Sequence, residues 1–92
     1  MHYAMRVQLK NASFVDLARL WSETARRGFT DVVVADDGRR FKLMPGDYDI
    51  VTDQDLFTVY RLAKDAANAT GRESAIDVQQ TPARMWDGLA QV

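Results

Sequence analysis

The N-terminal residues alternate between apolar and polar side chains. Successive side chains of a β-strand point to opposite faces, so alternation over several residues is typical of a half-buried strand. The apolar positions are Tyr3, Met5, Val7 and Leu9, and the intervening ones are Ala4, Arg6, Gln8 and Lys10. The pattern predicts a strand over residues 3–10 whose odd-numbered side chains face the core.

The next segment changes to helical spacing. Ser13 and Asp16 have the spacing of a capping box, in which each side chain accepts a hydrogen bond from the other residue's backbone amide. Gly28 supplies a residue that easily adopts the left-handed conformation common just after a helix. We therefore predict a helix over residues 14–27 whose apolar stripe, including Trp21, packs into the core. The stripe consists of Phe14, Leu17, Ala18, Trp21 and Ala25.

Residues 31–44 have the pattern of a β-hairpin. Asp37-Gly38 is a strong signal for a two-residue type I′ turn, because both central residues of that turn need positive φ. This loop predicts a register in which Ala35 faces Arg40, Val34 faces Phe41, Val33 faces Lys42 and Val32 faces Leu43. Val32, Val34, Phe41 and Leu43 then share the inner face, and Val33 lies on the outer one.

The second half of the chain predicts a further helix and a less regular tail. The helix begins near Asp53 and ends at Gly71, with a stripe made of Leu56, Val59, Tyr60, Ala63, Ala66 and Ala67. Ile76 and Val78 favour a short strand. Thr81-Pro82 is typical of a helix start, because proline is well tolerated at the first helical position, and predicts a short helix over residues 82–87 that carries Met85 and Trp86.

The resulting order is β-α-β-β-α-(β), which indicates an α+β fold with a small antiparallel sheet and two helices on one face. We expect one domain over residues 1–92, with its core in residues 3–71. Residues 72–92 either complete a ferredoxin-like sheet through a strand and a short helix, or form a tail docked on a three-stranded variant. The sequence leaves both alternatives open.

Four carboxylates lie within nine residues, at Asp47, Asp49, Asp53 and Asp55. A calcium loop needs a run of ligands at alternate positions, a glycine at its sharp turn and a closing bidentate glutamate. Here Ile50 and Val51 interrupt the acids, no such glycine follows Asp49, and no glutamate closes the loop. Thr52 and Asp55 repeat the capping-box spacing at the start of the second helix. Asp47 follows a turn, and Asp49 has the alternation of a solvent-facing strand residue. The stretch is therefore interpreted as local structure.

Composition excludes several kinds of chemistry. The chain has no cysteine, so disulfides, thiolate catalysis and cysteine-based metal sites are excluded. Its only histidine, His2, lies where a terminus frays. We expect a non-catalytic protein without metal or cofactor. No apolar run has the length of a membrane span or a signal peptide, which predicts a cytoplasmic protein without membrane contact. Arginine outnumbers lysine and alanine is abundant, which favours a bacterial or phage source.

The predicted sheet has a cationic outer face. If the first and third strands are neighbours, their outward side chains place four cations and no acid together, with Val33 at the margin. These cations are Arg6, Lys10, Arg40 and Lys42. Such a face is either simply solvated or binds an anionic partner. Trp86 is interpreted either as part of a packed tail or as an anchor in an interface.

The favoured functional hypothesis is a small stand-alone inhibitor or adaptor that binds an acidic protein surface through this face. A phage-type inhibitor of a bacterial defence system, such as an anti-CRISPR protein, is one concrete form. Two alternatives stay open: a nucleic-acid-binding module that grips phosphates, without aromatic side chains for base stacking, and a dimeric small-ligand or enzyme domain of ferredoxin-like type.

Overall fold

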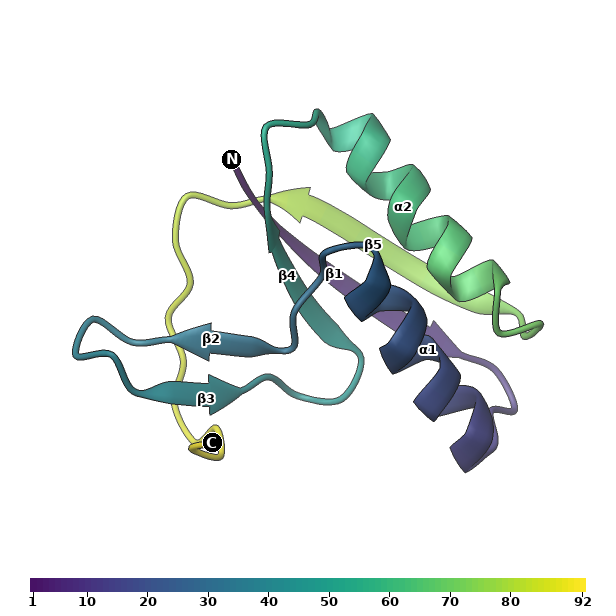
Figure 1. Cartoon of the computed structure of the whole chain (residues 1–92), viewed down its shortest axis with the longest axis horizontal. Coiled ribbons are helices and arrows are strands. Elements are labelled where there is room, and N and C mark those ends of the chain that lie inside the picture. The colour runs from purple at the N-terminus through teal and green to yellow at the C-terminus, as the bar shows by residue number, and fades with distance from the viewer.

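The protein is a small α+β domain, and a computed structural model describes residues 1–92 (Figure 1). The elements in chain order are β1 (His2–Leu9), α1 (Phe14–Arg26), β2 (Val32–Val34), β3 (Arg40–Lys42), β4 (Asp47–Val51), α2 (Leu56–Asn68) and β5 (Ser74–Gln80). The strands form two antiparallel sheets. One has the order β4-β1-β5, and the other is the β2-β3 hairpin.

The main sheet is ferredoxin-like, with one edge strand reduced to a single residue. Thr30 forms an isolated antiparallel bridge with Asp49, with both backbone hydrogen bonds at 2.8 Å. The spatial order is therefore β5, β1, β4 and then Thr30. The chain leaves the sheet after Thr30, and the hairpin extends away from it (Figure 1). The neighbour of β1 is consequently β4, and the prediction that the strand at residues 40–42 pairs beside it is wrong.

The core lies between the main sheet and the two helices, as predicted. Tyr3, Met5 and Val7 of β1 are buried, which confirms the inward direction of the odd-numbered side chains. They pack with Leu20 of α1 and with a small-residue stripe of α2. That stripe consists of Val59, Ala63 and Ala67, all fully buried. Residues 74–80 complete the sheet as β5, so the predicted fourth strand is confirmed.

The helix caps follow local sequence signals, with one correction. Ser13 and Asp16 form the predicted capping box of α1. The N-cap of α2 is Asp55, whose carboxylate accepts the Thr58 amide at 2.8 Å. The Thr52 hydroxyl instead accepts the Gln54 amide at 3.2 Å. Each of these hydrogen bonds satisfies an otherwise unpaired backbone amide. The residue that caps α2 is therefore Asp55, three residues after the predicted Thr52.

The hairpin register differs from the predicted one by one residue. Val33 pairs with Phe41, Val34 with Arg40 and Val32 with Lys42. The loop has three residues, since the Gly38 amide donates to the Ala35 carbonyl at 2.9 Å and Gly38 has φ of 88°. This is a type I turn followed by a glycine bulge, the usual three-residue alternative to the type I′ loop. The slip buries Val33 and exposes Val34.

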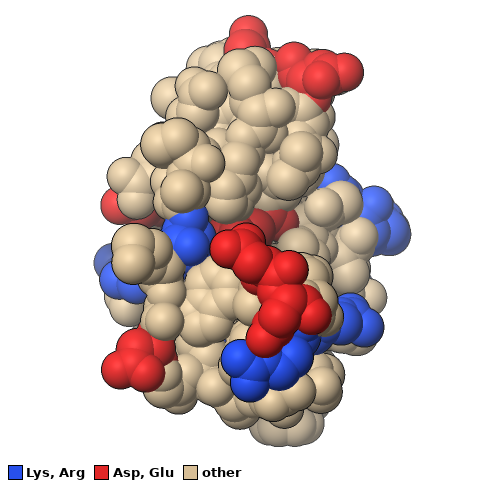
Figure 2. Space-filling model, turned by 90° about the vertical axis from the view of Figure 1, so that its left-hand side faces the viewer, with Lys and Arg blue, Asp and Glu red and all other residues tan.

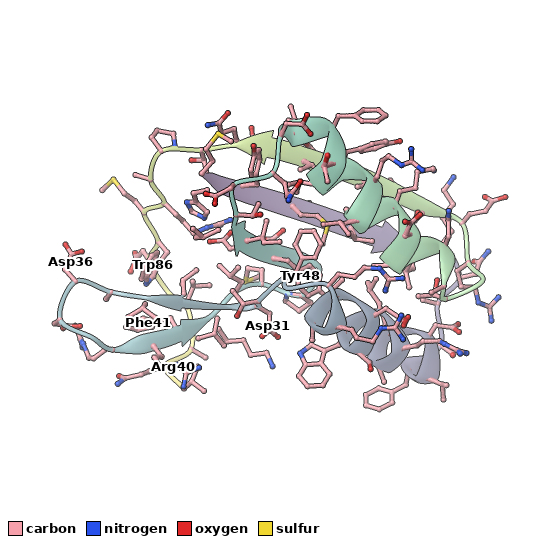
Figure 3. The ribbon with its side chains drawn as sticks, turned by 45° about the horizontal axis from the view of Figure 1, so that its top comes forward. Asp31, Asp36, Arg40, Phe41, Tyr48 and Trp86 are labelled. Carbon is pink, nitrogen blue, oxygen red and sulfur yellow. The ribbon has the colours of Figure 1, made fainter.

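The C-terminal tail packs on the hairpin and contains no helix, so the predicted helix over residues 82–87 is wrong. The Lys42 amide donates to Ala90 and the Val92 amide to Arg40, both at 2.9 Å. The rings of Phe41 and Trp86 pack in a tilted arrangement, with centroids 5.8 Å apart and an interplanar angle of 55°, and Arg40 points away from them (Figure 3). Phe41 thus packs against the tail, where the sequence predicted that it faces the helices.

Candidate docking groove

The apolar stripe of α1 is divided between the core and the surface. Leu20 is 2% exposed and packs inward, whereas Phe14, Leu17 and Trp21 are 86%, 50% and 55% exposed. The prediction that this stripe belongs to the core is therefore wrong, because its other two members, Ala18 and Ala25, are exposed as well. The apolar arc of α1 is wider than the part that meets the core, so a sector of large side chains stays largely exposed.

These side chains form one wall of a groove. The groove has a volume of about 980 Å³ and lies between α1 and the segment Lys42–Tyr48, with Gly88–Ala90 of the tail beside it. Val7, Leu20 and Leu43 reach the groove from the core and are themselves buried. The groove exists because the hairpin turns away from the sheet after Thr30, which leaves the space beside α1 uncovered (Figure 1).

Polar groups at the hairpin end of the groove are mutually satisfied. The Asp31 carboxylate accepts a hydrogen bond from Trp21 Nε1 at 3.2 Å and lies 3.4 Å from Lys42 Nζ. Tyr48 lies beside Asp31 near the end of α1 (Figure 3). Burial raises the pKa of the Tyr48 hydroxyl, the Thr24 hydroxyl opposes this shift, and the negative charge of Asp31 adds to it. Tyr48 is therefore a neutral, uncharged part of the groove at physiological pH.

The predicted cationic face does not exist as a single surface. Arg6 lies on β1 in the main sheet and Lys10 directly follows this strand, while Arg40 and Lys42 lie on β3 in the hairpin. The premise that their strands are central neighbours is wrong, because β4 occupies the position beside β1. The hypothesis that these residues bind a partner stays a prediction, but it no longer rests on a shared plane.

Three of these four cations also have an acidic neighbour. Arg6 Nε donates to Asp47 at 2.8 Å, and this hydrogen bond raises the pKa of Arg6. Lys10 lies 3.8 Å from Glu73, and Lys42 is paired with Asp31. Charges of both signs also lie side by side at the hairpin end, where Arg39 pairs with Asp37 (Figure 2). Compensated charges of this kind are weak anchors for a polyanion.

Val33 and Trp86 occupy places other than those predicted for partner binding. Val33 belongs to β2 of the hairpin and is buried, so it is not part of an outer margin. Trp86 is half-buried against Phe41, which matches the packed-tail interpretation of this residue. Both side chains line a second, smaller cavity of about 290 Å³ between β2, β4 and the tail.

One ionic cluster was missed by sequence reasoning. Asp49 was predicted to face solvent, but it is buried on the sheet face opposite the helices. Its carboxylate lies 2.9 Å from His2 Nε2 and accepts two hydrogen bonds from Arg84, at 2.5 and 3.2 Å. His2, which was expected to fray, belongs to β1. The only available sequence signal was Arg84, an isolated arginine in the tail. Sequence spacing alone does not connect it to Asp49, which lies 35 residues earlier.

The described side chains contain no group of three histidine, cysteine, aspartate or glutamate residues placed to hold a metal ion. Neither helix of the structure has the length and apolarity needed to cross a bilayer. We therefore take the groove beside α1, which offers apolar contacts and little charge, as the candidate functional site. No protein-family model matches the chain, and the search of curated proteins finds no relative.

Proposed function

We propose that the protein is a non-catalytic protein-binding domain and that the groove beside α1 receives an apolar segment of a partner protein. The single observation that carries the proposal is the exposure of Phe14, Leu17 and Trp21 along one wall of an apolar groove. Large contiguous apolar patches on a soluble domain mark interaction sites, and aromatic residues supply much of the binding energy at such sites.

The exposed area supports an interface of ordinary size. Phe14 and Trp21 together present roughly 300 Å² of side-chain surface, given that an aromatic side chain buries about 150–250 Å² when fully covered. A standard interface buries about 800 Å² on each partner, so the two rings supply a large share of its centre. The inhibitor or adaptor role fits a domain of this kind. The acidic partner surface predicted from the cations is replaced here by an apolar one.

The test uses two matched substitutions. Phe14 and Phe57 are both exposed residues in the first turn of a helix, but only Phe14 lines the groove. An aspartate near a helix N-terminus interacts favourably with the macrodipole, so Phe14→Asp and Phe57→Asp both leave the fold intact. Proteins captured from the native host by the wild type are identified by mass spectrometry, expressed, and titrated calorimetrically against each variant.

We expect Phe14→Asp to weaken binding of the captured partner at least tenfold, which corresponds to about 1.4 kcal/mol. Phe57→Asp leaves the affinity within about twofold of the wild type, because it lies outside the groove. Equal affinities for wild type and Phe14→Asp would contradict the proposal. Circular dichroism and thermal unfolding of both variants serve as the folding control.

A further inference from the structure

The strand β1 extends beyond its neighbour β4 at the groove. On the β5 side, β1 is paired from Tyr3 through Leu9. On the β4 side, the register ends at Arg6 opposite Asp47, followed by one hydrogen bond of 2.8 Å from the Val7 amide to the Gly46 carbonyl. The last residues of β1 therefore have a partner strand on one side only.

The free groups belong to Leu9. In an antiparallel sheet, the backbone groups of alternate residues point to the same neighbouring strand. The Lys10 amide bonds to Glu73 beside β5, and the Val7 amide bonds toward β4. Leu9 therefore directs its amide and carbonyl toward the β4 side, where no residue of β4 lies opposite. Both groups face the groove, which Leu9 helps to line.

A turn keeps β4 from filling this position. The Asp47 amide donates to the Met44 carbonyl at 2.9 Å, so the chain turns away from β1 just before β4 begins. Gly46 lies so close to β1 that a Cβ atom built on it would be 2.6 Å from the Val7 carbonyl oxygen. This tight contact fixes the end of the ladder at Gly46 and leaves the position beside Leu9 open.

The unpaired amide and carbonyl of Leu9 decide which backbone conformation a segment bound in the groove takes. A helix laid across the groove would cover the Leu9 amide and carbonyl without bonding to them, because its own backbone groups are already paired. An extended segment in line with β4 bonds to both groups. Its side chains then point alternately into the groove, toward Leu17 and Leu20, and out to the opposite sheet face.

The charges restrict the chemistry of the occupant. The charged groups that line the groove are Asp31, Lys42 and Asp47, and each is engaged in an ion pair within the chain. The groove therefore presents no uncompensated charge. Its electrostatic complement is an uncharged apolar side chain, because a charged one would lose its hydration without gaining a free counter-ion.

We infer that the groove binds an extended, uncharged, apolar segment of a partner protein by strand addition to β1 at Leu9. The inference rests on the proposed function and specifies the partner's conformation and composition. A partner helix and a second copy of this chain are the alternative occupants, and the experiment distinguishes them.

The probe is a phage-displayed library of random linear peptides. The library is selected on the wild type and counter-selected on Phe14→Asp, and enriched sequences are synthesised. We expect apolar residues at every second position, with at least tenfold weaker binding to Phe14→Asp and unchanged binding to Phe57→Asp. N-methylation of single backbone amides along a peptide should abolish binding only at alternate positions, because only those amides point toward β1.

Amide hydrogen exchange gives a second, independent readout. In the free protein, we expect the Leu9 amide to exchange rapidly and the Val7 amide to be protected. Addition of a selected peptide should slow exchange at Leu9 at least tenfold. Protection of Leu9 in the free protein would overturn the inference at once.

The remaining outcomes separate the inference from the proposed function. Groove-dependent peptides with apolar residues at three- and four-residue spacing, and with Leu9 still exchanging rapidly, overturn strand addition but leave protein binding intact. A library that gives no peptide dependent on Phe14 contradicts both. A dimer by light scattering that Phe14→Asp converts to a monomer shows that a second copy fills the groove, and this also overturns the inference.

Discussion

The two helices have the same length and comparable amphipathic patterns, but they contact the sheet differently. The buried stripe of α2 consists of Val59, Ala63, Ala66 and Ala67. The buried residues of α1 are Leu20 and Thr24, and Phe14, Leu17 and Trp21 line the groove instead. The exposed large apolar residues of α2, Leu56, Phe57 and Tyr60, do not line this groove. Small residues allow α2 to lie close over β1 and β5. The comparison shows that an apolar stripe alone does not determine which of its residues reach the core.

The largest expected effect separates the two faces of α1. Leu20→Ala removes a buried side chain and should lower the free energy of unfolding by about 2–5 kcal/mol. Trp21→Ala, at the next residue, should cost less than about 1 kcal/mol, because its ring is more than half exposed. Chemical denaturation of both variants gives the two values. Similar losses would mean that the outer face of α1 is packed.

A smaller effect compares matched alanines in the two helices. Ala63→Leu places three extra carbons in the contact between α2 and the sheet and should destabilise the protein by about 1–3 kcal/mol. Ala18→Leu makes the same change on the exposed face of α1, which is open to the groove, and should leave stability within about 0.5 kcal/mol. Thermal unfolding at one pH measures both. A destabilised Ala18→Leu variant would argue against an open groove.

The smallest effect concerns the caps and their dependence on pH. Hydrogen bonding from the Thr58 amide lowers the pKa of Asp55 below its ordinary value. Its contribution to stability is therefore complete above the unfolded pKa of about 3.9 and is lost as pH falls through the lower folded value. Asparagine caps comparably but does not titrate, so Asp55→Asn should flatten the acid limb of a plot of Tm against pH.

The pKa of Asp16 in α1 is lowered as well, first by the Ser13 amide and then by Arg72. The Asp55→Asn variant should therefore keep part of the acid limb. A profile identical to that of the wild type would show that the α2 cap contributes nothing to acid sensitivity.

Local signals in the sequence were sufficient for much of the fold. The alternation of β1 and the Ser13–Asp16 box each depend on residues close in sequence, and both were predicted correctly. The hairpin register failed because Asp37-Gly38 fits loops of two or three residues. In the structure the Asp37 carboxylate accepts the Arg39 amide at 3.0 Å, which accompanies the longer loop. No residue pattern distinguishes these loops in advance.

The candidate site was less predictable because it depends on where the hairpin goes. The sequence identifies Phe14, Leu17 and Trp21 as an apolar stripe, but it does not show that the chain leaves the sheet after Thr30 and uncovers them. Likewise, the environment of Asp49 depends on Arg84, which lies 35 residues later. Non-local arrangements of this kind require the tertiary structure.

The contact between Asp49 and Arg84 has a consequence for how the protein forms during synthesis. When β4 emerges from the ribosome, β5 and the Arg84 guanidinium that pairs with its buried carboxylate have not yet emerged with it. A chain that stops before residue 84 leaves this buried carboxylate with His2 as its remaining ionic neighbour and without the two hydrogen bonds from Arg84. Stable closure of the main sheet therefore requires the segment that follows β5, and β4 cannot be completed by the strands that precede it.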